Sequence, residues 1–430
     1  RLQLQTNLQI QTVIVSHLAL QQHLCRILNK LVFQPDIAAP EIVTQVWCSA
    51  IIAHASDIHY EPQATHYCIR LRIDGQLSAL TTLDSSQRHA ITNHLKVLFN
   101  LDISEKRRAQ DGRHTLKTAV GTKEARMSTC PTIHGEKIVV RLLTSQQHIR
   151  PLTDLGLSTL QKTLLTSAIR QPQGLILITG PTGSGKSMTL YTLLQTLNTP
   201  DLNIASVEDP VEMIVPNITQ VNVHEATGFS FSAALKAFLR QDPDILMIGE
   251  IRDKETAITA LQAAQTGHLV LATLHTNSAQ AAISRLIDLG ASPWDISHTL
   301  TLVSAQRLVR KLCVHCKTLA TNAHSGPYKP IQPLLALDAL YQAVGCAACH
   351  RGYQGRIGIH ALMPMTPSLR TLVDNNASLS TLKQQTPTTN LWASAVKAIN
   401  AGITSYYEIE RILGQPEAPF TTNKQQKNDV

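Results

Sequence analysis

The sequence contains no run of about 20 apolar residues, the length that a helix needs to cross a bilayer, and no signal peptide is visible at its start. Aromatic residues make up only 4% of the chain and form no stripe on which nucleic-acid bases would stack. Lys and Arg outnumber Asp and Glu by 38 to 30, but they form no large basic block. The sequence therefore predicts no membrane-spanning helix and argues against a module that reads bases.

The length and composition are those of a folded protein with several domains. A chain of 430 residues with 43% hydrophobic residues is too long for one compact domain, so we expect about two or three. The formal net charge of +8 permits contact with nucleic acid or an anionic membrane surface, although the scattered charges favour an ordinary solvated surface. The first residue is Arg1 rather than Met, which leaves open a truncated N-terminus.

A glycine-rich segment, residues 174–191 with the sequence GLILITGPTGSGKSMTLY, has the order strand, loop and helix. Its second part matches G-x-x-x-x-G-K-[ST], in which backbone N–H groups and the Lys hold phosphates and the hydroxyl binds Mg²⁺. A chance glycine loop is the alternative, and the strand before it and the helix formers after it argue against that. We predict a nucleoside triphosphate site with Ser187 as magnesium ligand. Its residues are Gly180, Pro181, Thr182, Gly183, Ser184, Gly185, Lys186, Ser187 and Met188.

Three further apolar runs follow, LNIASVE (202–208), DILMI (244–248) and LVLATL (269–274), with helix-like segments between them. Strands that alternate with helices predict an α/β fold with a parallel sheet, and such sheets bind ligands at the carboxyl ends of their strands. Glu208, Glu250 and His275 all fall at such ends. We therefore expect these three residues and the phosphate loop to form one site.

Each of these strand-end residues has a candidate role and a plainer alternative. Glu250 is the candidate for polarising the attacking water, with a surface or helix-capping glutamate as the alternative. His275 is the candidate sensor of the γ-phosphate, whereas for His268 a site role and an ordinary place at a strand start are equally favoured. Gly249 stands where an Asp often binds Mg²⁺, so metal contact is left to Ser187, the phosphates and water.

Residues 41–150 are predicted to form an α+β unit with helices at 42–53 and 87–100. Alternating residues 67–74 predict a strand, and the Asp-Gly pairs at 74–75 and 111–112 are turn signals. Five arginines lie on or beside the expected strands: Arg70, Arg72, Arg113, Arg126 and Arg141. Any one of them is ordinarily a surface residue, but as a group they would bring positive charge to a phosphate on a neighbouring subunit.

Two C-x-x-C pairs, Cys313 with Cys316 and Cys346 with Cys349, predict a closed four-thiolate zinc site with a structural role. Four unrelated thiols are the alternative. The segment between the pairs is longer than in the commonest zinc ribbons, and we expect a helix at 334–344 within it. The other four cysteines are isolated in the sequence, and we expect them to be buried apolar residues: Cys25, Cys48, Cys68 and Cys130.

The composition and patterns together predict six divisions of the chain. They are a short helical segment at 1–40, the α+β unit at 41–150, the nucleotide-binding core at 151–305, the cysteine subdomain at 306–362, a helical region at 363–414 and a disordered tail at 415–430.

With these residues assembled, the chain resembles the secretion ATPase superfamily that powers type II secretion and type IV pilus assembly. The resemblance covers about residues 41–413, and it is strongest to the pilus-assembly extension ATPases. It implies a RecA-like core, a PAS-like N-domain before it and a four-cysteine zinc subdomain after it. The matching segments are ASDIHYEP, RLRIDG, QDGRH, GEKIVVRLL, NIASVEDPVE, LRQDPDILMIGEIRD, TGHLVLATLHTNSA and GYQGRIGI, with the phosphate loop and the cysteine pairs.

The resemblance also implies roles for particular residues. Glu208 in SVEDPVE matches the catalytic acid of the family's acidic box, and Glu250 in ILMIGEIRD matches the general base of its Walker B segment. TGHLVLATLH matches the histidine box, which ends at His275. Arg113 and Arg126 match N-domain arginines that reach nucleotide in the family. The cofactors implied are ATP, Mg²⁺ and Zn²⁺.

Members of the resembled family are cytoplasmic homo-hexamers at the inner membrane, where they act on a membrane platform protein so that pilins are extracted. Two departures, Met188 for the usual Thr or Ser and HALMP for a more acidic segment, affect no predicted site role. The short region before residue 41 favours pilus assembly over type II secretion, and the four cysteines argue against retraction ATPases.

Three other functions stay open from the sequence. One is a type II secretion ATPase that drives a pseudopilus. Another is a DNA-uptake or nucleic-acid translocating motor, although we expect no specific nucleic-acid partner because no base-reading module is present. The third is a scaffold that binds nucleotide without hydrolysing it.

Overall fold

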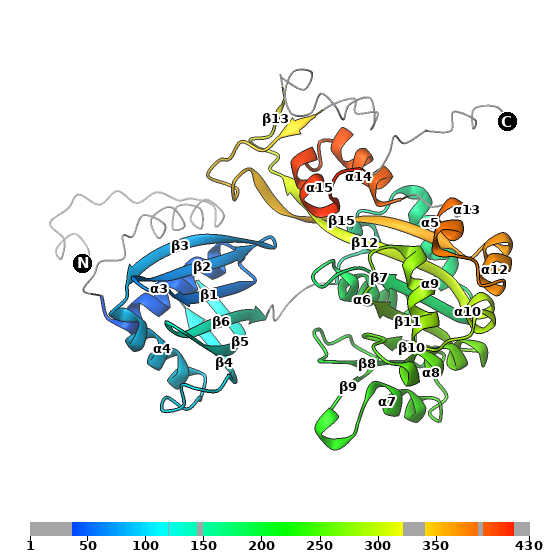
Figure 1. The fold of residues 1–430 in the computed structure, drawn as a ribbon, viewed down its shortest axis with the longest axis horizontal. Helices are drawn as coiled ribbons and strands as arrows, with labels where there is room; N and C mark the ends of the chain where they lie inside the picture. The colour runs from blue at the N-terminus through cyan, green and yellow to red at the C-terminus, as the bar shows by residue number, and fades with distance from the viewer. Residues whose placement is uncertain (1–36, 119, 144–148, 321–339, 386–389, 417–430) are drawn as a thin grey trace. The chain divides into compact units, whose positions relative to one another are not determined.

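The computed structural model describes residues 37–118, 120–143, 149–320, 340–385 and 390–416 (Figure 1). The N-terminal segment before residue 37, with Cys25, and the tail after residue 416 lie outside these ranges, so the predictions for them stay predictions. The chain divides into two compact units: the part up to Gln146 groups with the short segment Cys346–His350, and the remainder from Gln147 onwards forms the second unit. Among the described helices, none combines the length and the apolar character that a bilayer crossing requires.

The first unit is an antiparallel sheet with two helices on one face. Its elements are α3 (Ala39–Ile52), β1 (Asp57–Pro62), β2 (His66–Ile73), β3 (Gln76–Asp84), α4 (Gln87–Leu98), β4 (Gln110–Thr118), β5 (Gly121–Thr132) and β6 (Gly135–Leu143). The six strands have the order β3-β2-β1-β6-β5-β4. Alternation sets the core, because Ile58 and Tyr60 of β1 are fully buried beneath the helices while Asp57 and His59 take the other face. The helices and strands expected in this unit are confirmed.

One turn predicted in this unit is correct and the other is wrong. Asp74 and Gly75 connect β2 to β3 with positive φ angles of 48° and 84°. Asp111 and Gly112 instead lie inside β4, where a Cβ on Gly112 would meet the carbonyl oxygen of Phe99 at 2.5 Å. This glycine is therefore needed for close packing against the end of α4 rather than for a turn. Of the isolated cysteines, Cys48 is buried as expected, Cys68 is half-buried, and Cys130 is exposed, contrary to expectation.

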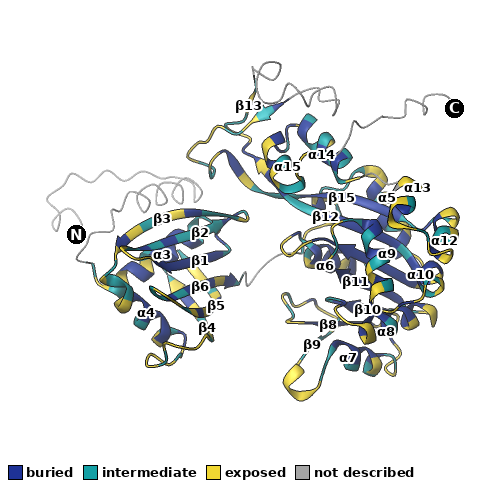
Figure 2. Cartoon of the chain, viewed as in Figure 1, coloured by how far each residue is buried: buried dark blue, intermediate teal, exposed yellow. Residues whose placement is uncertain are grey.

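The second unit is built on a seven-stranded sheet with the order β15-β12-β7-β11-β10-β8-β9. All neighbouring strands are parallel except β12 and β15. The strands are β7 (Gly174–Thr179), β8 (Ile204–Glu208), β9 (Thr219–Asn222), β10 (Ile245–Ile248), β11 (Leu269–Leu274), β12 (Leu300–Leu312) and β15 (Tyr353–Pro364). Figure 2 shows β7, β10 and β11 buried along their length, as their unbroken apolar sequences require.

Helices cover both faces of this sheet, as the alternating pattern predicted. The residues of β7 show the two faces: Leu175 and Leu177 pack with α8 and α9, whereas Ile176 and Ile178 pack with α5 and α6. The helices are η1 (Leu152–Leu155), α5 (Thr159–Ile169), α6 (Lys186–Leu197), η2 (Glu225–Thr227), α7 (Phe231–Phe238), α8 (Lys254–Gln265), α9 (Ala279–Asp288) and α10 (Pro293–Thr299). The fold is therefore the α/β P-loop architecture that the sequence predicted.

The sheet continues past residue 305, where the sequence suggested the end of the core. β12 runs unbroken to Leu312 and pairs with β15, so both strands belong to the central sheet. Beyond them, β13 (Thr318–Leu319) pairs with β14 (Tyr341–Gln342). The helix expected at 334–344 is wrong in its described part, because residues 341–342 form this short strand; residues 334–339 lie outside the described residues.

Four C-terminal helices pack on the second unit: α12 (Pro367–Asp374), α13 (Leu379–Gln385), α14 (Leu391–Asn400) and α15 (Tyr406–Leu413). A buried ion pair attaches α15 to β12. Glu408 is fully buried, and its carboxylate accepts from Arg310 Nη2 at 2.8 Å and from Arg411 Nη2 at 2.7 Å. The Arg310 guanidinium also stacks 3.8 Å from the centre of the Tyr353 ring. This helical region therefore forms part of the second unit's packed structure.

Candidate active site

The predicted phosphate loop lies between β7 and α6, and its glycines have conformations that other residues rarely adopt. Gly185 precedes the first residue of α6 with φ 89°, and Gly180 has φ 152°. A Cβ on Gly180 would lie 2.6 Å from the carbonyl oxygen of Gln306. Lys186 is buried, and its Nζ donates to the carbonyl oxygens of Gly180 at 2.9 Å and Pro181 at 3.2 Å. The loop thus wraps its own lysine at the start of a helix, where anions bind.

Gln306 of β12 supports this loop and its neighbour Arg307 contacts the segment after β11, and the sequence patterns singled out neither residue. Gln306 is buried; its Nε2 donates to the Ser184 carbonyl oxygen at 2.8 Å and its Oε1 accepts from Thr189 at 3.0 Å. Arg307 donates to the Asn277 carbonyl oxygen at 3.0 Å. Burial, and to a smaller extent the charge of Arg307, lower the pKa of Lys186, while Glu250 opposes this shift. The sequence did contain a hint of these roles, because Gln306 and Arg307 are two consecutive polar residues inside a mostly apolar strand.

Glu250 and His275 meet at the ends of neighbouring parallel strands, as predicted. Glu250 follows β10 and His275 follows β11, and His275 Nε2 lies 3.1 Å from Glu250 Oε1. The other carboxylate oxygen accepts from Arg252 Nε at 2.8 Å, and Arg252 also contacts Asp209 at 3.4 Å. Burial and the charge of Lys186 lower the pKa of His275, against the opposing effect of Glu250, and so favour the neutral ring. A neutral ring can orient the carboxylate by donating one hydrogen bond to it.

Glu208 lies at the same edge, because β8 is the next parallel neighbour of β10. Its carboxylate is buried and accepts hydrogen bonds from the hydroxyl of Tyr191, from Ser206 Oγ at 2.8 Å and from Gln220 Nε2 at 3.2 Å. Burial raises the pKa of Glu208, and these three bonds oppose that rise because they stabilise the charged form. The strand-end prediction located this residue, but not the hydrogen bonds that surround it.

His268 contacts the end of helix α8. It precedes β11, and its Nδ1 lies 2.9 Å from the carbonyl oxygen of Ala263 in the last turn of α8. This contact favours the plainer of its two expected roles, because the ring lies against the C-terminal end of α8, where Thr266 and the His268 backbone N–H bond the same carbonyl group.

Arg113 and Arg126 lie in the first unit, directly opposite each other on β4 and β5. Both side chains are exposed, and Arg126 is in register with Arg141 on β6. Arg141 Nε in turn donates to Asp57 at 2.9 Å. The sheet therefore carries a row of arginines on adjacent strands, on the face opposite the two helices. A contact of Arg113 or Arg126 with nucleotide stays a prediction.

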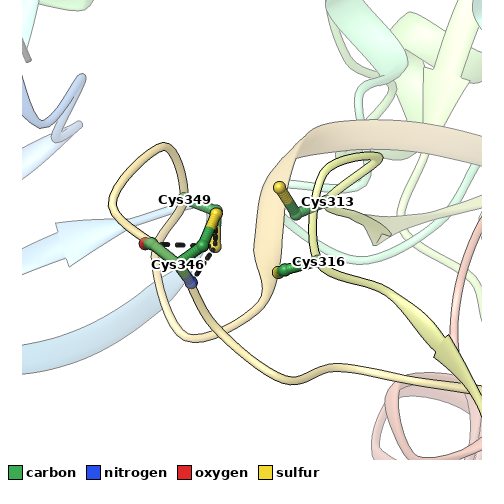
Figure 3. Close-up of side chains that lie close together, drawn as sticks. All are labelled: Cys313, Cys316, Cys346 and Cys349. Carbon is green, nitrogen blue, oxygen red and sulfur yellow. Dashed lines mark hydrogen bonds between the residues drawn. The ribbon is translucent and has the colours of Figure 1, made fainter.

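The four cysteines of the two C-x-x-C pairs come together, and their sulfur atoms all lie within 4.8 Å of one another. Figure 3 shows Cys313 and Cys316 facing the loop that carries Cys346 and Cys349. The sulfurs of Cys346 and Cys349 are 3.7 Å apart. A tetrahedral site with Zn–S bonds of about 2.3 Å places its sulfurs about 3.8 Å apart. The donor set is therefore compatible with zinc, and helix α15, through Arg310, packs on the strand that leads to Cys313.

Comparison with known proteins agrees with this fold and these motifs. Residues 36–411 match the family described as type II/IV secretion system protein. The chain is 45% identical to the "Protein transport protein HofB homolog" of Escherichia coli, over 87% of this chain and 82% of that protein. It is 41% identical to the "Type IV pilus assembly ATPase PilB" of Pseudomonas aeruginosa, over 88% of this chain and 68% of that protein.

Two further similarities bear on the function. The chain is 42% identical to the "Putative type II secretion system protein E" of Escherichia coli, over 89% of this chain and 79% of that protein. Among solved structures, the pilus retraction motor PilT with bound ADP aligns with a TM-score of 0.55 and 26% identity, covering 89% of this chain and 98% of that one.

Proposed function

The chain belongs to the type II/IV secretion system protein family, and on this premise we propose that it is a hexameric motor that hydrolyses ATP to power pilin assembly at the bacterial inner membrane. The observation that carries the proposal is the convergence of Lys186, Glu250 and His275 at one edge of a parallel sheet. A phosphate-binding lysine and a carboxylate held by hydrogen bonds are the parts that hydrolysis of a nucleoside triphosphate requires.

In this proposal each residue of the edge has one task. The loop from Gly180 to Ser187 binds the phosphates, and the Ser187 hydroxyl holds the Mg²⁺ that neutralises their charge. Glu250 accepts the proton of the attacking water, and His275 keeps its carboxylate aimed by the 3.1 Å contact. Glu208, at the end of the neighbouring strand, is the second catalytic carboxylate of the site.

Three parts of the proposal lie outside the nucleotide edge of the sheet. Arg113 and Arg126 are exposed and adjacent, which suits charge stabilisation at a nucleotide of the hexamer. The four cysteines hold a structural zinc ion, which closes the hairpin after β12. The protein works in the cytoplasm against an inner-membrane platform protein, with no specific nucleic-acid partner.

The proposal is tested by measuring ATP hydrolysis of the purified full chain with membrane platform protein in vesicles, with plain duplex DNA, and with neither. We expect platform protein to stimulate turnover and DNA to leave it unchanged, with Lys186→Ala as the inactive control. Mass photometry with and without ATP measures assembly. Stimulation by DNA with a steep salt dependence would instead identify a nucleic-acid motor.

A type II secretion ATPase is the second candidate, favoured by the 42% identity to a protein of that name. Both candidates use the same site chemistry, so turnover alone does not separate them. Binding of the platform protein from a pilus system, compared with the platform protein from a type II system, distinguishes the two.

A further inference from the structure

We infer that Tyr191 is a positioning residue for hydrolysis: its buried hydroxyl holds the Glu208 carboxylate in place and ties it to the helix that begins at the phosphate loop. The inference rests on the proposed ATPase function. It adds a residue that neither the strand-end pattern nor the family motifs single out, because Tyr191 is part of the apolar face of α6.

The direction of the hydrogen bond follows from the partners of the tyrosine. The Tyr191 hydroxyl oxygen accepts from two backbone N–H groups, those of Glu212 at 3.2 Å and Met213 at 3.3 Å. A phenol has one proton to donate, and backbone N–H groups can only donate. The proton is therefore directed at Glu208, and the whole hydrogen-bonding capacity of the hydroxyl is used.

The carboxylate of Glu208 depends on such neutral donors. It is 4% exposed, and its other partners, Ser206 and Gln220, are also neutral. The charge of Glu212 has the same sign and raises the pKa of Glu208. Burial and Glu212 favour protonation of Glu208, while the three hydrogen bonds favour its ionised form. Removing one donor therefore makes the carboxylate harder to ionise.

The position of Tyr191 gives this bond a second consequence. Tyr191 lies one helical turn after Ser187, and Glu212 and Met213 follow the strand that carries Glu208. One hydroxyl group thus connects the phosphate-binding helix to the strand end and to the segment after it. The ring itself packs in the apolar core between α6, α5 and the sheet, so a Phe at this position keeps the packing and removes only the hydroxyl.

Tyr191→Phe in the full chain tests the inference, with Tyr353→Phe as matched control. Tyr353 is also buried and bonds Ser405 at 2.6 Å, but it lies beside α15. For Tyr191→Phe we expect kcat to fall about tenfold while the KM for ATP changes by less than about threefold, since phosphate contacts remain. We also expect the acid limb of the kcat–pH profile to move up by about one pH unit. Tyr353→Phe should change neither kcat nor the acid limb of the kcat–pH profile.

A double-mutant cycle with Glu208→Gln separates positioning from a general loss of structure. If Tyr191 acts through Glu208, Tyr191→Phe should have little further effect in a Glu208→Gln background. Equal effects in both backgrounds, or an unshifted pH profile, would overturn the inference. Wild-type turnover of Glu208→Gln alone would instead remove Glu208 from the proposed mechanism. Ser206→Ala, which removes a different donor, should shift the same limb in the same direction by less.

Discussion

His275 Nε2 lies 3.1 Å from Glu250 Oε1, at the ends of two adjacent parallel strands. The two residues are 25 positions apart in the sequence, and the sheet brings them together beside the phosphate loop. This contact fixes one oxygen of Glu250, and Arg252 holds the other. A carboxylate held at both oxygens keeps one orientation, which is what a group that must meet a water molecule requires.

Glu250→Gln should lower kcat by about a hundredfold or more while ATP still binds, because the amide cannot accept a proton but keeps the shape of the side chain. Turnover and the affinity for a fluorescent ATP analogue are the two measurements. Glu255→Gln is the control, since Glu255 is exposed and pairs with Lys236 away from the site. Unimpaired turnover in Glu250→Gln would exclude Glu250 as the general base.

Arg126→Ala should retain ATP binding and lose most turnover, because an arginine that stabilises transition-state charge contributes little to ground-state affinity. Lys123→Ala on the same strand is the control, because it removes a positive charge elsewhere on β5. Both variants are compared in steady-state ATPase assays at equal hexamer content. Normal turnover in Arg126→Ala would remove this residue from the site.

The cysteine cluster should hold about one zinc ion per chain, and Cys346→Ser should lose most of it. Elemental analysis of the purified protein measures the content directly. Cys130→Ser is the matched control, because Cys130 is an exposed cysteine in the first unit outside the cluster. Full zinc content in Cys346→Ser would show that this thiolate is not a ligand.

His360 should make the second unit less stable in acid. Its Nε2 contacts the Leu155 carbonyl oxygen at 2.9 Å, and its Nδ1 is buried without a hydrogen-bond partner among the described residues. Burial lowers the pKa of His360 to about 4, against about 6.5 in an unfolded chain. Above pH 6.5 the His360 ring is neutral in both the folded and the unfolded protein, so the free energy of unfolding is unaffected by it. As pH falls towards 4, His360 binds a proton in the unfolded protein but not in the folded protein. The free energy of unfolding therefore falls by about 3 kcal/mol.

The measurement for His360 is the free energy of unfolding as a function of pH. In His360→Gln the part of the acid destabilisation between pH 6.5 and 4 that belongs to this ring should disappear. His224→Gln, at an exposed histidine of the same unit, should keep the wild-type slope. If the free energy of unfolding depended on pH identically in wild type and His360→Gln, the prediction would be contradicted.

Glu408→Gln should destabilise the second unit by about 3 kcal/mol, because it leaves the buried Arg310 charge without its counter-charge. Urea denaturation compared with Glu410→Gln, a less buried glutamate on the same helix, measures the difference. A change below about 0.5 kcal/mol would show that Arg310 is stabilised by other groups, such as the ring of Tyr353.

Much of the fold and part of the site could be predicted, because both depend on local patterns. Unbroken apolar runs predicted the parallel strands, and the rule that ligands bind at carboxyl ends placed Glu208, Glu250 and His275 beside the phosphate loop. Gln306 was missed because it supports Ser184 from a strand 122 residues away, and no local pattern reports such a contact. Tyr191 was missed for a related reason. A helical pattern predicts that its ring is buried, but it does not predict that its hydroxyl meets the Glu208 carboxylate.

Gly112 shows a different limit. An Asp-Gly pair is a strong turn signal, yet here the glycine serves close packing against Phe99. Glycine suits both a turn and a close packing contact because it has no side chain. Only the position of α4 in the folded protein decides between the two.

β12 starts beside β7, the strand that leads into the phosphate loop, and ends one residue before Cys313. Its 13 residues span about 40 Å of continuous backbone, stiffened along most of that length by pairing with β15. The phosphate loop contacts this strand near its middle, where Gln306 donates to Ser184, and the same strand then continues to the cysteines. One hydrogen-bonded strand therefore joins the phosphate loop to the four-cysteine cluster, which gives the two sites a direct backbone connection.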